Sequence, residues 1–359
     1  MHYQNKYRSF ARKVIFLGLV VVFLFTCMLS YISYARTQNY SISTVGTLFV
    51  VNKLDRSITV FDLETGALIK ELFVATQPRE ITALPDKKSV AFTNYGDNYM
   101  PGKSISLLDV NTLQITKKIP LQSATRPHGI TSFRSSNRVA VATNGGNKLF
   151  IIDTDKDSIE LALSTKQRIS HMVVAHPYKP LIYVTHKSSG NLSVIDYTNN
   201  QIVTNINCGM GADGIDITPD GKEIWIANTL ENTISVINTD TNELEDTLLS
   251  GKESYRLKFS VDGKYCFVSN AQDGTVLIFD RHTKERIKSL MLPGKKNFIE
   301  RALYHTPRPV GILMHPNGEY AFVSNSNADK VEVIDMKTFE IVSNINTGRV
   351  PDGLALVTF

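Results

Sequence analysis

The stretch Tyr320-Ala-Phe-Val-Ser-Asn325, followed by Val331-Glu-Val-Ile-Asp335, is the clearest copy of a segment that recurs seven times along the chain. The Asn position of the repeat falls at Asn52, Asn94, Asn144, His186, Asn228, Asn270 and Asn325. The Asp position falls at Asp62, Asp109, Asp153, Asp196, Asn238, Asp280 and Asp335. Most copies lie 42 to 44 residues apart, with longer gaps where loops are inserted. A repeat of this length, built from short alternating strands, is typical of propeller blades.

One complete copy, residues 309–348, predicts four antiparallel strands. A short apolar strand from Pro309 is followed by the turn Pro316-Asn-Gly, because Asn-Gly tolerates positive φ. The second strand ends at Asn325, and two more strands follow with the period-2 alternation of half-buried strands. No long helical apolar period occurs after residue 40. The sequence therefore predicts an all-β fold.

The two ends of the repeat region predict a closed ring. The first copy begins at Leu48 with a second strand that no first strand precedes. The chain ends with Pro351-Asp-Gly-Leu-Ala-Leu-Val-Thr-Phe359, a first strand that no second strand follows. Pairing these two segments completes the first blade and removes two exposed sheet edges. We expect a single domain over residues 47–359, a seven-bladed β-propeller closed by its C-terminal strand.

The N-terminal segment predicts export. Residues 1–35 contain Lys6, Arg8, Arg12 and Lys13 and no acidic residue, and residues 14–35 carry no charge. This pattern indicates either a signal peptide, with a small-x-small site at Ser33-Tyr-Ala35, or a transmembrane anchor helix over residues 14–32. Residues 36–46 are the expected linker. Both alternatives place the propeller in the periplasm, free or anchored to the cytoplasmic membrane.

The charge, the cysteine positions and the absence of known motifs argue against several classes of function. Without residues 1–35, the chain has 35 Lys and Arg against 34 Asp and Glu, so nucleic-acid binding is not favoured. Cys208 and Cys266 lie about two blades apart in the repeat, too far for a disulfide. No haem-attachment motif, no zinc spacing and no hydrolase or phosphate-loop motif occurs.

Alignment of the repeats brings mostly ionisable residues to one mouth of the central channel. The position one or two before the first aliphatic residue of each innermost strand reads Arg79, His128, His171, Asp213, Arg256, Val310 and Asp352. Its distance to the Asn position is 14 to 16 residues in every blade where both occur. Because innermost strands line the channel, we expect these side chains to converge there and form a ligand site.

Further residues on the same face extend this candidate site. His186 replaces Asn in the fourth blade, and with His128 and His171 it could bind a metal or a haem. The other Asn positions are expected to be structural, bonding to nearby backbone. A basic insertion with Lys295, Lys296, Arg301 and His305, together with Arg126 and Arg308, suggests an anionic ligand. A second insertion spans Tyr95 to Lys103, and long loops of this kind tend to carry function.

The repeats resemble the YVTN-type, lactonase-like family of seven-bladed β-propellers. The resemblance rests on Leu181-Ile-Tyr-Val-Thr-His with Leu192-Ser-Val-Ile-Asp196, on Ile224-Trp-Ile-Ala-Asn228, and on the turn Thr218-Pro-Asp-Gly-Lys222. It covers residues 47–359 and implies the fold. Related propellers include lactonases, a virginiamycin-type lyase and the haem-binding propeller of nitrite reductase. The resemblance carries over one ligand-binding residue, His128 in Arg126-Pro-His-Gly-Ile130.

Three functions follow as hypotheses. The first is an exported, non-catalytic binding or scaffold propeller that holds a protein partner or an anionic small molecule at the channel mouth. The second is a lactonase- or lyase-like enzyme that uses the histidines and arginines of the same mouth. The third is a carrier of haem or metal. The sequence does not identify a cofactor or a ligand.

Overall fold

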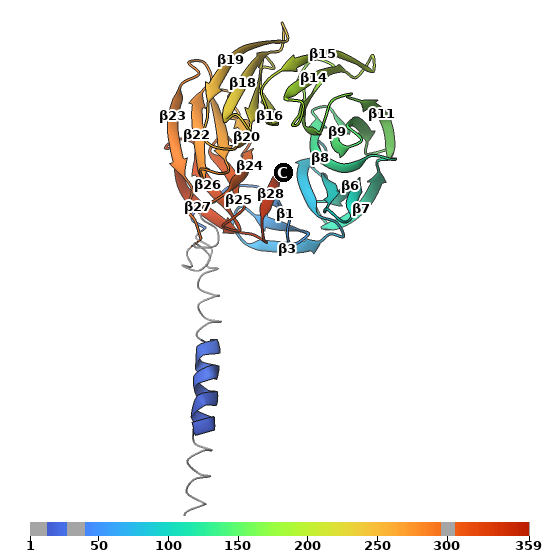
Figure 1. Ribbon diagram of the computed structural model, residues 1–359. Coiled ribbons are helices and arrows are strands. Elements are labelled where there is room, and N and C mark those ends of the chain that lie inside the picture. Colours follow the sequence, from blue (N-terminus) through green and yellow to red (C-terminus); the bar gives the residue numbers. More distant parts are fainter. Residues whose placement is uncertain (1–12, 27–39, 296–305, 359) are drawn as a thin grey trace, which may run out of the picture.

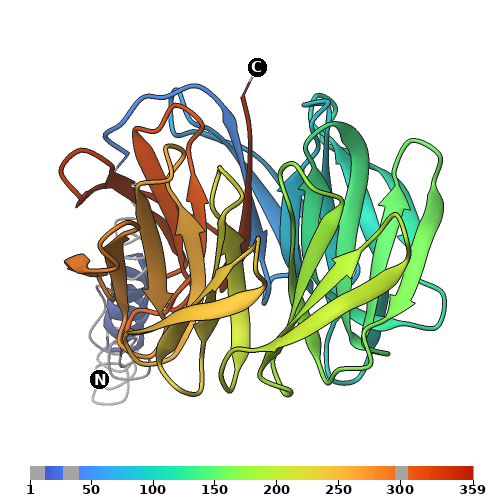
Figure 2. The same cartoon turned by 90° about the horizontal axis from the view of Figure 1, so that it is seen from above.

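The computed structural model describes residues 13–26, 40–295 and 306–358. Their strands form seven antiparallel sheets of four strands each, arranged as blades around a central channel (Figure 1). The predicted all-β, seven-bladed propeller is confirmed. Figure 2 shows the ring from the side, with loops joining the strands at its two faces.

The blades are numbered along the chain, and each is given from its innermost strand outward. Blade one contains β28 (Pro351–Val357), β1 (Thr47–Asn52), β2 (Ser57–Asp62) and β3 (Leu68–Phe73). Blade two contains β4 (Pro78–Ala83), β5 (Ser89–Gly96), β6 (Pro101–Asp109) and β7 (Gln114–Pro120). Blade three contains β8 (Thr125–Phe133), β9 (Ser136–Gly145), β10 (Lys148–Asp153) and β11 (Ser158–Ser164). Blade four contains β12 (Ser170–Ala175), β13 (Leu181–His186), β14 (Asn191–Asp196) and β15 (Gln201–Asn207).

The remaining three blades follow the same order. Blade five contains β16 (Ala212–Ile217), β17 (Glu223–Asn228), β18 (Thr233–Asn238) and β19 (Glu243–Leu249). Blade six contains β20 (Ser254–Phe259), β21 (Tyr265–Asn270), β22 (Thr275–Asp280) and β23 (Arg286–Met291). Blade seven contains β24 (Pro309–Met314), β25 (Tyr320–Asn325), β26 (Lys330–Asp335) and β27 (Glu340–Asn346).

Burial explains the pattern of the repeat. The second strand of each blade, such as β25, is buried along nearly its whole length because neighbouring blades cover both of its faces. Outer strands such as β19 are mostly exposed and polar. The repeated Asp closes the turn after the third strand, where Oδ1 of Asp335 accepts the backbone N–H groups of Lys337 and Thr338.

The C-terminal strand closes the ring, as predicted. β28 pairs antiparallel with β1, with Val357 opposite Thr47 and Leu354 opposite Val50. It occupies the innermost place of blade one, next to the channel (Figure 1). Blade one therefore joins the first and last strands of the chain. The apolar core continues across this blade, because Leu354 packs in a cluster that also contains Phe322 of blade seven.

The segment before the first strand reinforces the closure. The hydroxyl of Tyr40 donates to the carbonyl of Leu63, and Oγ of Ser41 donates to the carbonyl of Val342 at 2.5 Å. Oγ1 of Thr44 lies 3.3 Å from Nε2 of His315. The described part of the expected linker, residues 40–46, therefore packs against blades seven and one.

Only part of the predicted N-terminal helix lies within the described residues. Residues 13–26 form a helix, and the remainder of residues 1–35 lies outside them. Among the residues that the structure describes, no helix combines the length and apolar character needed to cross a bilayer. The prediction of a membrane anchor over residues 14–32 therefore gains no support. The two described cysteines, Cys208 and Cys266, are free, and both are buried.

Candidate functional site at the channel mouth

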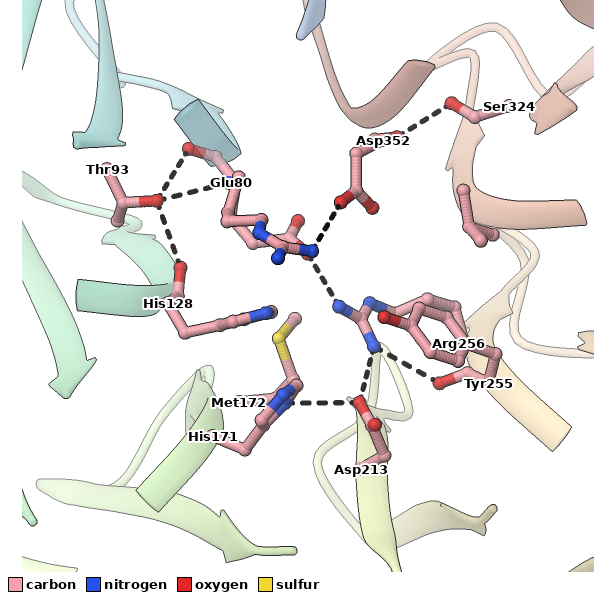
Figure 3. A network of polar contacts seen from close by, with 12 residues as sticks. Glu80, Thr93, His128, His171, Met172, Asp213, Tyr255, Arg256, Ser324 and Asp352 are labelled. Atoms are coloured by element: carbon pink, nitrogen blue, oxygen red, sulfur yellow. Dashed lines mark hydrogen bonds and ion pairs between the residues drawn. The ribbon is translucent and has the colours of Figure 1, made fainter. Parts of the chain in front are cut away.

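Each position singled out by the repeat lies near the start of an innermost strand, at one end of the channel. We call these seven residues the mouth ring: Arg79, His128, His171, Asp213, Arg256, Val310 and Asp352. The side chains of His128, His171, Asp213 and Arg256 point toward a common centre (Figure 3). His128 is 2% exposed, Asp213 is 0% exposed and Arg256 is 5% exposed. Charged groups from separate blades are thus brought together in a buried place.

Arg256 connects opposite sides of the channel. Its Nη1 donates to Oδ1 of Asp213 in the preceding blade at 2.5 Å. Its Nη2 donates to Oε1 of Glu80 at 2.7 Å, across 176 residues of sequence and from blade six to blade two (Figure 3). This ion pair spans the channel.

The carboxylate of Asp213 contacts three basic side chains. Besides Arg256, it contacts Nζ of Lys187 at 2.5 Å through Oδ2. Nδ1 of His171 lies 3.1 Å from Oδ1 of Asp213. Burial alone would raise the pKa of Asp213, but His171 and Arg256 outweigh it and hold the pKa well below its usual range. Asp213 is therefore a fixed negative charge.

The rest of the mouth is organised around an aromatic ring from the second insertion. Nη1 of Arg79 lies 3.5 Å from Oδ2 of Asp352. The guanidinium of Arg79 also lies 4.6 Å from the ring centre of Tyr95, which meets the ring of His128 edge-on at 5.3 Å. His128 in turn stacks on His171 with 3.8 Å between ring centres. The inserted hairpin thus places Tyr95 at the mouth.

Both mouth histidines are neutral at physiological pH. Burial lowers the pKa of His128 well below its usual range, and His171 and Arg256 lower it further. Burial also lowers the pKa of His171, although Asp213 opposes this effect. A neutral imidazole has one donor and one acceptor nitrogen. The stacked pair therefore offers hydrogen-bonding groups without adding charge.

Glu80 is a mouth residue that the alignment of the repeats did not predict. It stands where four other blades have glycine directly after the mouth residue: Gly129, Gly214, Gly311 and Gly353. The strand register gives Arg256 the same place in blade six, so its alignment with the mouth residues is corrected by one position, to Tyr255. A Cβ at Gly214 would lie 2.4 Å from the carbonyl oxygen of Tyr255 in the next blade, so glycine allows the innermost strands to approach closely. The sequence feature that could have identified Glu80 is an acidic residue at a position where most of the repeats have glycine.

The carboxyl of Glu80 titrates near neutrality. Burial raises its pKa to about 7, while Arg256 lowers it and Asp352 raises it further. The charge of Glu80 therefore changes in the physiological pH range.

Hydroxyl groups fix the backbone of the mouth ring. Thr93 of blade two donates to the carbonyl of His128 in blade three at 3.2 Å (Figure 3). Ser324 of blade seven donates to the carbonyl of Asp352 in blade one at 2.7 Å. In the same way, the hydroxyl of Thr185 donates to the backbone carbonyl of Asp213, and the hydroxyl of Ser269 donates to that of Val310. In blades two, four, six and seven, the residue before the repeated Asn position therefore ties its blade to the next.

His186 does not join the other two histidines. Its Nε2 lies 2.8 Å from Oγ of Ser193 and its Nδ1 lies 3.2 Å from Oγ of Ser170, inside blade four. It takes the role of Asn228, whose Nδ2 donates to Oγ of Ser235 at 2.9 Å. The proposed grouping of three histidines is therefore corrected. The expectation that the Asn positions bond to backbone is also corrected in part, because several bond to hydroxyls of the third strand instead.

Replacing His186 with Asn is expected to flatten the acid side of the stability curve. Burial lowers the pKa of His186 from 6.5 to about 3 in the folded protein. Below pH 6.5 the imidazole of His186 is protonated in the unfolded chain but stays neutral in the folded protein. The free energy of unfolding therefore falls as the pH is lowered to about 3. Between neutral pH and about pH 5 this loss amounts to about 2 kcal/mol. Chemical unfolding at both pH values measures it, and equal pH slopes in the variant and the parent would contradict the assignment.

The remaining predicted residues lie at the rim or outside the described residues. The guanidinium of Arg308 bonds to both carboxylate oxygens of Glu253, at 2.9 and 2.5 Å. Nζ of Lys295 lies 2.8 Å from Oδ2 of Asp329. The other basic residues of the predicted flap, Lys296, Arg301 and His305, lie outside the described residues. Within the described part of the chain, no group of three His, Cys, Asp or Glu side chains is placed to hold a metal ion.

Comparison with known proteins identifies the fold. No protein-family model matches this chain, and no curated protein matches it. Among solved structures, Kuenenia stuttgartiensis hydrazine synthase superposes with a TM-score of 0.68 at 17% identity, over 78% of this chain and 89% of that one. A functionally unknown protein from Desulfotomaculum acetoxidans gives a TM-score of 0.71 at 14% identity, over 88% and 99%. The dihydro-heme d1 dehydrogenase NirN, in complex with DHE, gives 0.61 at 15% identity, over 89% and 77%. These likenesses show a propeller fold, and the YVTN-type resemblance is supported only at that level.

Proposed function

We propose that this protein is an exported, non-catalytic binding propeller that holds a small organic anion at the channel mouth and takes up a proton with it. The observation that carries the proposal is a set of buried polar atoms at the mouth that bond to no described residue: Nε of Arg79, Nδ1 of His128, Nε of Arg256 and Oδ1 of Asp352. Unbonded polar atoms are costly in a protein interior. Their convergence supports a polar occupant.

The charges at the mouth favour an anion. Arg79, Arg256 and Lys187 balance the carboxylates of Glu80, Asp213 and Asp352. Lys53, which interacts electrostatically with Arg79 and Asp352, adds one further positive charge, and burial with Arg79 lowers its pKa. A single anionic group restores neutrality, and guanidinium N–H groups suit a carboxylate.

Glu80 couples anion binding to proton uptake. When its carboxyl is protonated, it no longer repels an anion, and Nη2 of Arg256 is free to donate to the ligand instead. Because the pKa of Glu80 is about 7, binding should be strong below neutral pH and weaken above it. The sign follows from linkage, since a bound anion stabilises the protonated carboxyl and raises its pKa further.

Calorimetric titration with acetate and lactate between about pH 6 and about pH 8 tests the proposal. The affinity is expected to fall by up to about tenfold for each pH unit above about 7. Glu80→Gln should remove this pH dependence. Glu332→Gln is the matched control, because Glu332 is also buried with a pKa raised to about 7 but lies within blade seven. The proposal fails if neither acid binds, or if the Glu80→Gln variant keeps the parent's pH dependence.

A second candidate is a lactonase- or lyase-like enzyme. The contact between His171 and Asp213 favours it, because a carboxylate that orients a histidine is the arrangement a general base needs. Turnover of γ-butyrolactone that disappears in a folded His171→Gln variant would favour this function over the first.

Export is proposed on the sequence of the first 35 residues, in which four basic residues precede an uncharged apolar run. A fusion of alkaline phosphatase after residue 46 tests it. Phosphatase activity in intact bacteria is the expected result, and an inactive fusion protein would refute export.

A further inference from the structure

A cavity of about 660 Å³ lies at the opposite mouth, the end of the channel away from the mouth ring. The C-terminal ends of β8, β12, β16, β20 and β24 and the turns after them form it. All of the residues that line it come from blades three to seven, so the cavity is not symmetric about the ring. Its volume is in the range of pockets that hold small organic molecules.

One wall of the cavity is aromatic and rigid. The rings of Phe133 and Tyr197 meet edge-to-face with 5.3 Å between their centres. The guanidinium of Arg138 lies over Phe133 at 4.6 Å and is held by Glu160 at 3.3 Å. Tyr178 is fixed across two blades, because its hydroxyl donates to the carbonyl of Pro219 at 3.1 Å. These contacts hold the rings of Phe133, Tyr197 and Tyr178 in place along the cavity before any ligand arrives.

The cavity carries one uncompensated positive charge among the described residues. Three of its basic side chains are paired: Arg138 with Glu160, Lys179 with Asp240, and Lys258 with Asp216. Arg134, the fourth, is exposed and has no carboxylate of the described residues within ion-pairing distance. Its guanidinium lies 5.5 Å from the ring centre of Tyr178. A cation is thus presented beside an aromatic face at the rim.

The other wall comes from blades five to seven. Its apolar part is formed by Pro219, Val261, Met314 and Pro316, and the polar residues Asp216, Lys258 and Ser260 line it as well. A ligand that fits both walls has a flat apolar body and one negative charge. We propose that this cavity binds a planar aromatic carboxylate, with its carboxylate on Arg134 and its ring between Tyr178 and the apolar part of the other wall. This site is independent of the channel mouth and of the function proposed for it.

Titration of the full-length protein with benzoate, followed by ligand-observed NMR and calorimetry, tests the inference. Benzoate is expected to bind, and benzamide, its neutral isostere, to bind at least about tenfold more weakly. Arg134→Gln should raise the Kd for benzoate about tenfold or more, and Tyr178→Ala should weaken binding as well. Lys222→Gln, which removes an exposed charge from the same face outside the cavity, is expected to leave the Kd unchanged.

The channel-mouth variant Arg79→Gln separates the two sites. Benzoate binding that persists in Arg79→Gln and is lost in Arg134→Gln supports the inference. The inference is overturned if benzoate does not bind, if benzamide binds equally well, or if the loss follows Arg79 instead of Arg134. Because Arg134 is exposed, its replacement should leave the fold intact, and a thermal unfolding curve verifies this.

Discussion

Removal of residues 351–359 is expected to abolish cooperative folding of the ring. The deletion takes away β28, the innermost strand of blade one, and with it the buried side chains of Leu354, Ala355 and Val357. Burial of each large aliphatic side chain contributes about 1.5 to 3 kcal/mol. The loss also opens the edge of β1, whose backbone pairs with β28 over most of its length. Together these losses approach the whole stability of a typical domain, about 5 to 15 kcal/mol.

A circular permutant is the matched control. The end of β28 lies opposite the start of β1, because Val357 pairs with Thr47. Residues 351–358 can therefore be placed before β1 through a short turn, as in the other blades, with the new C-terminus at Val350. We expect the truncated chain to lack a cooperative thermal transition and the permutant to regain one. A truncated chain that melts like the parent would show that β28 does not close the ring.

Arg256→Ala is expected to destabilise the protein by about 3 to 5 kcal/mol. The substitution leaves the buried Asp213 with Lys187 as its remaining cationic partner, and it leaves Glu80 without its partner across the channel. Removal of one member of a buried ion pair is far more harmful than removal of an exposed pair. Denaturant unfolding at neutral pH measures the difference.

Two comparisons make this measurement specific. Lys264→Ala breaks an exposed ion pair, in which Nζ of Lys264 lies 3.3 Å from Oδ2 of Asp262, and should change stability by less than about 1 kcal/mol. Asp213→Asn in the Arg256→Ala background should recover part of the loss, because Asp213 keeps its negative charge in the folded protein and the neutral amide removes it. An Arg256→Ala protein as stable as the Lys264→Ala control would contradict the structural role of the network.

The repeat made most of the fold predictable because it carries both backbone periodicity and turn chemistry. The Asn and Asp positions mark where strands end, and the unmatched strands at Leu48 and Pro351 are enough to identify the closing strand. The packing of residues 40–46 was not predictable. Its contacts, such as Thr44 with His315, join segments 271 residues apart and leave no local pattern.

The candidate site was predicted only in part, for a related reason. Alignment of the blades shows which residues share the mouth, and so it found His128, His171, Asp213 and Arg256. It cannot show which of them face one another across the channel, so the contact between Arg256 and Glu80 was missed. His186 was misplaced because alignment gives the position of a residue on a strand but not the direction of its side chain.

The most direct test of the central claim is native mass spectrometry of the full-length protein, purified from its own host near neutral pH. The account predicts a bound small organic anion in the parent and in Arg134→Gln, and its absence in Arg79→Gln and His128→Gln. A parent protein that carries no such molecule, or one that the two mouth variants retain, would contradict an anion site at the channel mouth.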